Sequence, residues 1–347
     1  MRVLILSINN NKGGAESILK QIYEYYIKKN IHTNVCFLTR SDSDFWNLKN
    51  QNIICISNNF SILKISYFLI KNRHNFDRVH TSHSKISFII GILKRLRLFN
   101  SVIIARESTN SIKRYTGNKK RVYKILYKLC YSRIDVVICQ SKEMLNDLSR
   151  YISISKLVHI KNPHKFMDHI DDESKNNKNF IMSAGRLINE KGFDILIKAF
   201  NDIKSTTNLN LKIFGDGPDK QKLENLIKEL KLSDRVTLEG YSKNIINHMR
   251  SSDACIVSSR IEGFPNVLLE MMSVNNNIVS TLCSGDIESI SGIYKAKTHD
   301  ISDLSLKIKE CLSKDNSESR TLFTNELKNR NIENFMKSAL IKLDSFK

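Results

Sequence analysis

Short β-branched runs alternate with helical stretches along most of the chain, and this alternation constrains the fold more than any other feature. A repeated strand and helix pattern predicts a parallel sheet with helices on both faces. The pattern runs twice, and Asn162-Pro163 ends the first round. A polar stretch rich in Asn, Lys and acidic residues follows and has no apolar periodicity. The sequence therefore predicts an α/β protein with two Rossmann-like domains that face a cleft.

These breaks place the domain boundaries. We predict an N-terminal Rossmann-like domain over residues 1–163, a linker over 164–178 and a C-terminal Rossmann-like domain over 179–320. Residues 321–347 resemble one amphipathic helix, which we expect to pack back on the N-terminal domain. A chain of 347 residues with 41% hydrophobic content is long enough to build two cores. Candidate strands of the second domain are 180–183, 212–214, 236–238, 254–257 and 278–280.

The net charge of +20 is concentrated in the first half of the chain. Residues 1–163 hold 28 of the 55 basic and 9 of the 35 acidic side chains, which leaves 27 against 26 for the rest. Residues 85–128 contain twelve basic side chains and one acid, Glu107. Such a field attracts polyanions, and the interleaved apolar and aromatic residues favour an anionic membrane surface. Solvated charges over a buried apolar face would give the same pattern.

Cysteine usage and hydropathy bear on the compartment. The seven cysteines are scattered and form no Cys-x-x-Cys, which favours reduced thiols in a cytoplasmic protein over disulfides or a zinc site. The N-terminal residues show no signal-peptide pattern. The longest apolar stretch, residues 86–93, is far shorter than the ~20 residues that span a bilayer. We therefore expect a cytoplasmic protein.

Three loops of the second domain carry the residues with the most distinctive chemistry, and each follows a predicted strand. Residues 184–192 place Arg186 and Lys191 in a glycine-flanked loop, and residues 215–218 form a Gly-Asp-Gly-Pro turn. Residues 260–272 place one carboxylate on each side of a helix start, where Pro265 suits the first helical position. The carboxyl ends of parallel strands share one edge, so two cations and a helix N-terminus meet there. This arrangement predicts a cradle for a diphosphate.

Each of these residues also has a plainer interpretation. A single surface cation is more often solvated than bound, and two acids beside a helix start are common on surfaces. Taken without the cations, Glu262 and Glu270 suggest the acid and base pair of a glycoside hydrolase. Their position beside the cations favours binding and orientation of a phosphorylated sugar.

Five motifs in this order resemble the retaining glycosyltransferases of the GT-B fold, family 4, in the form found in bacterial surface-polysaccharide assembly. The resemblance covers both halves of the chain. The motifs are Gly13-Gly14-Ala15-Glu16, Ile160-Lys161-Asn162-Pro163, Gly185-Arg186-Leu187 with Lys191-Gly192, Gly215-Asp216-Gly217-Pro218, and the Glu-x7-Glu pattern from Glu262 to Glu270.

The resemblance implies roles for individual residues. Arg186, Lys191 and Glu262 would be catalytic, with His83 and Glu107 on the acceptor side. No metal and no cofactor would be needed, because the nucleotide sugar is a substrate. Residues expected to bind the donor are Gly13, Gly14, Gly185, Gly215, Gly263, Phe264, Pro265, Asn266 and Glu270. Two segments depart from the family pattern: 106–108 reads Arg-Glu-Ser where many relatives carry a histidine, and 273–280 lacks the usual Gly and Pro.

The expected reaction is transfer of a hexose or N-acetylhexosamine from a nucleotide sugar to a lipid-linked glycan acceptor, with retention. A UDP-sugar is favoured and a GDP-sugar is the alternative donor. The setting would be capsule, O-antigen or exopolysaccharide assembly at the inner face of the cytoplasmic membrane, with residues 85–128 against anionic lipid. Two other interpretations are a nucleotide-sugar epimerase of the same fold and a basic nucleic-acid-binding protein. The sequence shows no helix-turn-helix, zinc finger or RNP-like pattern to favour the last.

Overall fold

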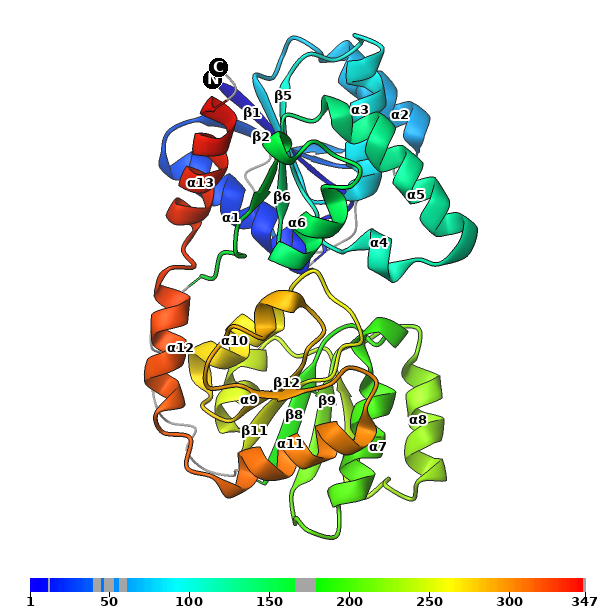
Figure 1. Ribbon diagram of the computed structural model, residues 1–347, viewed down its shortest axis with the longest axis vertical. Coiled ribbons are helices and arrows are strands. Elements are labelled where there is room, and N and C mark those ends of the chain that lie inside the picture. Colours follow the sequence, from blue (N-terminus) through cyan, green and yellow to red (C-terminus); the bar gives the residue numbers. More distant parts are fainter. Residues whose placement is uncertain (12, 40–44, 47–52, 56–60, 166–178, 346–347) are drawn as a thin grey trace. The chain divides into compact units, whose positions relative to one another are not determined.

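The chain divides into two compact units, each built around one parallel sheet (Figure 1). The first unit comprises Met1–Lys165 with Arg330–Lys347, and the second comprises Phe166–Asn329. The predicted α/β class with two Rossmann-like sheets is confirmed. Of the predicted linker, only its first two residues lie inside the described part of the chain. The computed structural model describes residues 1–11, 13–39, 45–46, 53–55, 61–165 and 179–345.

The first unit holds a seven-stranded sheet in the order β3-β2-β1-β4-β5-β6-β7, and all its strand pairs are parallel. The strand order changes direction between β1 and β4, which makes this the switch point at which open parallel sheets bind ligands. The strands are β1 (Arg2–Ser7), β2 (His32–Phe37), β3 (Ile53–Cys55), β4 (Arg78–Thr81), β5 (Val102–Arg106), β6 (Val136–Cys139) and β7 (Leu157–His159).

Alternate residues of β1 bury into opposite faces of this sheet. Leu4 and Leu6 join the core beneath α2, α3, α5 and α6, whereas Val3 and Ile5 join the core beneath α1 and α13. This two-residue period is what a central strand buried on both faces requires. The helices are α1 (Gly14–Lys28), α2 (Ile62–Lys71), α3 (Ser84–Arg95), α4 (Ser111–Arg114), α5 (Gly117–Cys130), α6 (Lys142–Leu148) and α13 (Ile332–Asp344).

The end of the chain forms two helices where the sequence suggested one. α12 (Ser319–Lys328) packs against α10 in the second unit, and α13 packs against α1 in the first. The side chain of Asn331 accepts a hydrogen bond from the N–H of Asn334 at 2.8 Å, so it caps the start of α13. A side-chain cap of this kind favours a new helix start, which explains the break.

The second unit holds a six-stranded parallel sheet in the order β10-β9-β8-β11-β12-β13, with its switch point between β8 and β11. One face packs on α7, α8 and α11, and the other on α9, α10 and α12. The strands are β8 (Phe180–Ala184), β9 (Asn210–Phe214), β10 (Val236–Gly240), β11 (Ala254–Val257), β12 (Ile278–Thr281) and β13 (Tyr294–Ala296). The helices are α7 (Phe193–Ile203), α8 (Lys220–Glu229), α9 (Ile245–Ser251), α10 (Asn266–Val274) and α11 (Ile301–Ser313).

Sequence patterning missed β13 and α11. β13 is a three-residue edge strand with Lys295 at its centre, so it offers no apolar run to recognise. α11 begins behind a side-chain cap, because Asp300 accepts from the N–H of Asp303 at 2.9 Å. Its residues Leu304 and Ile308 are buried against the sheet. The sequence signal for α11 was an aspartate that could cap a helix, followed by apolar residues four positions apart.

Candidate active site

The switch point of the second sheet brings together the loops that follow β8 and β11. The loop after β8 contains Arg186 and Lys191, and the loop after β11 contains Glu262. β9 lies on the other side of β8 and is followed by the turn at 215–218. The three loops predicted to carry the chemistry therefore leave one edge of one sheet.

The loop after β8 is hydrogen-bonded to the turn after β9. The N–H of Gly185 donates to the carbonyl oxygen of Phe214 at 2.9 Å, and the N–H of Leu187 donates to that of Asp216 at 2.9 Å. Gly215 has φ of 134°, and a Cβ placed there would lie 1.9 Å from the carbonyl oxygen of Gly185. Only glycine fits this position, so the close approach of the two loops explains one of the predicted donor-site glycines.

Lys191 ends a short 3-10 turn, Asn189–Lys191, that leads into α7. Gly192 follows in the left-handed region with φ of 65°, and a Cβ there would lie 2.2 Å from the carbonyl oxygen of Ser258. The hydroxyl of Ser258 donates to the carbonyl oxygen of Lys191 at 2.9 Å. Backbone contacts therefore fix the base of the Lys191 side chain against the loop after β11.

The ammonium of Lys191 donates to Oε1 of Glu262 at 2.5 Å, and the hydroxyl of Ser259 donates to the same oxygen at 3.0 Å. Only about a fifth of each side chain of the ion pair is exposed, 21% for the lysine and 19% for the glutamate. Burial lowers the pKa of Lys191, but the charge and hydrogen bond of Glu262 outweigh burial and raise the pKa overall. The lysine therefore stays charged at neutral pH. The structure brings these two predicted residues into direct contact.

Arg186 lies on the same loop but is exposed. Within the part of the chain that the structure describes, its guanidinium makes no hydrogen bond or ion pair. Its place in the site stays a prediction. A long exposed side chain at the mouth of a loop remains available to a ligand.

The loop after β11 leads directly into α10. The N–H of Glu262 donates to the carbonyl oxygen of Cys283 at 2.9 Å, and the hydroxyl of Ser284 donates to the carbonyl oxygen of Gly263 at 2.8 Å. Cys283 and Ser284 both lie in the segment that follows β12, and β12 is the strand next to β11 in the sheet. Phe264 is buried and anchors the loop in the core beneath α10. The glutamate and the helix start are therefore held by two adjacent strands.

Pro265 occupies the N-cap of α10, one residue before the first helical position expected for it. Its φ of −76° suits the proline ring, and its side chain has no oxygen that could cap the first N–H groups. The first turn, from Asn266, contains no acid. Glu270 lies further along the helix and is partly exposed. A helix start of this kind favours an anion.

Sequence reasoning gave no role to Asp194 and Arg260, yet a bidentate ion pair between them joins the start of α7 to the loop after β11. Asp194 follows Lys191 by three residues, and Arg260 precedes Glu262 by two. An acid near Lys191 and a base near Glu262 in the sequence were the signal that could have predicted this ion pair.

The switch point of the first sheet carries a different contact. Gly13 caps α1, and a Cβ there would lie 2.3 Å from Oε2 of Glu16. Glu16 and His83 approach within 3.2 Å, from Oε1 to Nε2, and both side chains are mostly buried. His83 itself caps the start of α3. The Gly13-Gly14 loop and His83 therefore share one edge, and Glu16 is a partner that the sequence did not indicate.

Glu107 is buried in the core of the first unit, with 1% of its surface exposed. Its carboxylate accepts hydrogen bonds from the hydroxyls of Tyr127, at 2.8 Å, and Tyr131. Burial raises the pKa of Glu107 to about 7, against the lowering effects of the two tyrosines and of Arg106. The two tyrosines therefore cover the carboxylate, and the contact of Glu107 with an acceptor stays a prediction.

Two doubly wound units with loops of this kind at their carboxyl edges define the GT-B architecture, and solved structures agree. HepE of Anabaena, in complex with UDP and glucose, matches with a TM-score of 0.82 at 18% identity, over 99% of this chain and all of that one. The apo form of the lipopolysaccharide outer core galactosyltransferase WaaB matches with a TM-score of 0.72 at 18% identity, over the whole of both chains. At this identity the likeness concerns the fold alone.

The chain belongs to the family described as glycosyl transferases group 1, whose sequence profile matches residues 149–334. A glycosyltransferase of Methanocaldococcus jannaschii is 29% identical over 65% of this chain. The N-acetylgalactosamine-N,N'-diacetylbacillosaminyl-diphospho-undecaprenol 4-alpha-N-acetylgalactosaminyltransferase of Campylobacter jejuni is 32% identical over 55% of it. The matches span 60% and 54% of the length of these two relatives.

Proposed function

We propose that the protein is a retaining glycosyltransferase that moves a hexose or an N-acetylhexosamine from a UDP-sugar to a lipid-linked glycan during surface-polysaccharide assembly. The observation that carries this proposal is the Lys191–Glu262 pair at the switch point, directly before α10. The name of the Campylobacter jejuni relative supports a diphospho-lipid acceptor, and the UDP in the HepE complex supports the nucleotide. A GDP-sugar is the alternative donor.

The chemical requirement is to stabilise the negative charge that builds on the departing nucleoside diphosphate. Lys191 supplies a partly buried cation, Arg186 an exposed one, and the start of α10 supplies its N–H groups. Cations and helix dipoles act most strongly where water is scarce, which favours the partly buried lysine as the stronger contributor. Donor binding moves the ammonium from the carboxylate to the diphosphate.

Glu262 then becomes free to accept hydrogen bonds from sugar hydroxyls, while Glu270 accepts from the ribose. The backbone from Gly263 to Asn266 lies beside the sugar and phosphate, and Gly185 and Gly215 let the loops approach the donor. Retention is expected from an ion-pair-like transition state on one face of the sugar. Within the described residues, no group of His, Cys, Asp or Glu is arranged to hold a metal ion. Independence from metals and cofactors stays part of the proposal.

The acceptor is proposed to bind the first unit. Gly13 and Gly14 follow β1 at its switch point, and His83 follows the neighbouring strand, β4, at the N-cap of α3. The Glu16 carboxylate lies beside the imidazole, with Oε1 3.2 Å from Nε2 of His83. His83 would contact acceptor hydroxyls there.

A donor screen tests the proposed reaction. The protein is incubated with a panel of UDP- and GDP-sugars, and slow hydrolysis and the shift in melting temperature are measured. We expect one UDP-sugar to be hydrolysed with retention at the anomeric carbon, and UDP to stabilise the protein. Lys191→Ala should lower the hydrolysis rate about 10³-fold and reduce the stabilisation by UDP. Salt-titrated binding to random DNA with no response to any nucleotide sugar would overturn the proposal in favour of a nucleic-acid-binding protein.

We further propose that α3 and α5 bind the anionic lipids at the inner face of the cytoplasmic membrane. Among the described residues, no helix has the length and apolar character of a bilayer span. The two helices pack against each other and expose large apolar side chains at helical spacing. These residues, the α3–α5 surface, are Ile92, Leu96, Val122, Ile125 and Leu129.

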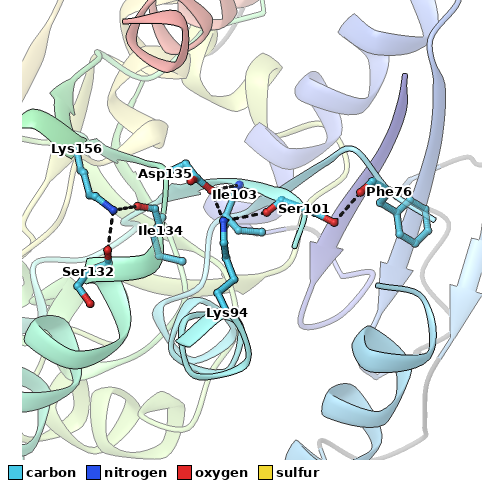
Figure 2. A network of polar contacts seen from close by, with 8 residues as sticks. All are labelled: Phe76, Lys94, Ser101, Ile103, Ser132, Ile134, Asp135 and Lys156. Atoms are coloured by element: carbon cyan, nitrogen blue, oxygen red, sulfur yellow. Dashed lines mark hydrogen bonds and ion pairs between the residues drawn. The ribbon is translucent and has the colours of Figure 1, made fainter. Parts of the chain in front are cut away.

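Some cations of residues 85–128 are buried or paired within the unit, and others are exposed near the α3–α5 surface in sequence. Figure 2 shows that Lys94 points inward, where its ammonium donates to the carbonyl oxygen of Ser101 at 3.0 Å and pairs with Asp135 at 2.6 Å. Arg106 is buried, and Lys113 pairs with Glu143. The exposed cations beside the α3–α5 surface are Arg95, Arg97, Arg121 and Lys128. Apolar residues flanked by outward cations suit an interfacial surface.

Liposome flotation tests this surface. The wild-type protein should float with vesicles that contain anionic lipid. Each cation near the membrane surface contributes about 1 kcal/mol of binding free energy, and salt screens this attraction, so the protein should dissociate as the salt concentration rises. Arg121→Gln with Lys128→Gln should weaken flotation, and Ile125→Ser should weaken it at all salt concentrations. Lys309→Gln on α11 of the second unit is the control and should float like the wild type. Flotation that depends on neither anionic lipid nor salt would contradict the proposal.

A further inference from the structure

Arg260 joins two segments of the second unit, the loop after β11 and the turn after β8. Its guanidinium pairs with Asp194 at 2.8 Å from Nη1 to Oδ1 and 2.6 Å from Nη2 to Oδ2. The same Nη1 donates to the carbonyl oxygen of Asn189 at 2.6 Å. The backbone N–H of Arg260 donates to the carbonyl oxygen of Glu190 at 2.8 Å. Four hydrogen bonds from one residue therefore end on residues 189–194.

These bonds form a closed ring with the site residues. In the sequence, Lys191 follows the two residues whose carbonyl oxygens accept from Arg260 and precedes Asp194. Glu262 lies two residues after Arg260. The Lys191–Glu262 contact closes the ring at 2.5 Å. Asp194 is the second residue of α7, next to Phe193, which is 3% exposed and packed in the core. The ring is therefore tied to the rigid part of the unit.

We propose that Asp194 and Arg260 are positioning residues that fix the Lys191 ammonium relative to Glu262 and the start of α10. This inference rests on the proposed function, because it assigns the pair a role in how Lys191 meets the diphosphate. Among these described residues, no hydrogen bond or ion pair joins the side chains of Asp194 and Arg260 to Nζ of Lys191 or the carboxylate of Glu262. The pair acts through the backbone of the turn that carries the lysine.

The pair matters most when a donor is bound. The Lys191–Glu262 hydrogen bond is lost once the ammonium turns to the diphosphate and the carboxylate turns to the sugar. The contacts that then still join the two segments are the four hydrogen bonds of Arg260, to Asp194, Asn189 and Glu190, and the bond from the Ser258 hydroxyl. A bidentate arginine holds both distance and angle, which a lysine cannot reproduce.

The test measures kcat and KM for the donor in Arg260→Lys and Asp194→Asn, each made in the wild type and in Lys191→Ala. A displacement of about 1 Å at a reacting group can cost about 100-fold in rate. We therefore expect a loss of roughly 10- to 100-fold in kcat in the wild-type background, with KM nearly unchanged. In the Lys191→Ala background the same substitutions should cost less than about twofold, because the residue they position is gone.

Arg235→Lys is the matched control. Arg235 also ties two segments together, with Nη2 donating to the carbonyl oxygens of Thr207 and Leu209 at 2.8 and 2.6 Å, but it lies before β10 at the opposite edge of the sheet. Its loss should lower the melting temperature and leave kcat within about twofold. Equal losses from Arg260→Lys in both backgrounds would mean a purely structural role and overturn the proposal. So would unchanged kcat in the wild-type background.

Hydrogen exchange separates this inference from the proposed function. The N–H groups of Lys191 and Gly192 donate within the turn, to Ile188 at 3.0 Å and Asn189 at 3.1 Å. Asp194→Asn should speed their exchange about tenfold or more, and Arg235→Lys should not. Unchanged exchange in Asp194→Asn would overturn the inference even in an active enzyme. A wild type that responds to no nucleotide sugar but shows the faster exchange in the variant would overturn the proposed function alone.

Discussion

The two units carry an acid and base contact at the same topological position, but the contacts differ in kind. In the second unit Lys191 and Glu262 form a pair with a permanent charge, surrounded by backbone contacts and a second ion pair. In the first unit the contact between Glu16 and His83 is ionic only when the imidazole is protonated. The second sheet therefore presents a charged ion pair at its switch point, and the first presents a carboxylate beside an imidazole.

The largest effect should follow from breaking the permanent pair. Lys191→Ala should lower kcat by about 10³-fold, because it removes a preorganised cation from the leaving group. It should also lower stability by roughly 2 kcal/mol, less than for a fully buried pair, because Glu262 is left without its partner. Steady-state kinetics and thermal unfolding check both.

The double variant Lys191→Met with Glu262→Gln separates the two effects. It should recover much of the melting temperature, since no unpaired charge remains, and stay inactive. Activity near the wild-type level in that variant would remove the pair from the mechanism.

The next effect compares one substitution in the two units. Gly192→Ala should destabilise by about 2–4 kcal/mol, because a left-handed φ penalises alanine and the added Cβ meets the backbone oxygen of Ser258 at 2.2 Å. Gly13→Ala should cost less than about 1 kcal/mol, since its Cβ meets only the end of the Glu16 side chain, which can rotate away. Chemical denaturation measures both. Equal destabilisation by the two substitutions would mean that the switch point of the first sheet is as rigid as that of the second.

The last effect concerns the dependence of stability on pH in the first unit, and it leaves the proposed active site untouched. The pKa of Glu107 is raised from 4.5 to about 7 by burial, so the folded chain keeps a proton that the unfolded chain has lost over this window. Stability from this group is present below pH 4.5 and falls as pH rises to about 7, by an amount on the order of 3 kcal/mol. Glu107→Gln should remove this fall. The single Trp46, buried against Phe37 in the first unit, supplies the fluorescence signal.

The stability of Glu107→Gln should be compared with that of the wild type at each pH, because His80 also makes stability depend on pH. Burial, followed by the charge of Arg78, lowers its pKa to about 3, so it contributes stability that is lost as pH falls below about 6.5. This trend opposes that of Glu107 and cancels in the difference between the two proteins. A difference that stays constant from pH 4.5 to 8 would contradict the assigned pKa of Glu107.

Local patterns predicted the sheets and the loops that leave them, because those depend on short-range sequence. The run Ala254–Val257 is buried throughout, as a central strand requires, and Gly215 marks a turn that no other residue fits. Contacts between distant segments could not be predicted. Arg260 meets Asp194 only because β8 and β11 are neighbours in the sheet. The tyrosines that enclose Glu107 come from α5 and the 3-10 turn after it, and nothing in the local sequence indicates that they fold over this residue.

Helix α13 has a consequence for how the protein is made. Its residues Phe335, Met336, Ala339 and Leu343 cover the same face of the first sheet as Val3 and Ile5. A ribosome adding about 5 to 20 residues per second needs on the order of 10 to 30 s to pass from β7 to α13. During that interval the second unit can finish folding while the first still exposes an apolar face. Val3 and Ile5 therefore lack this cover until α13 has been synthesised, and a chain stalled or truncated before α13 presents that face to chaperones and proteases.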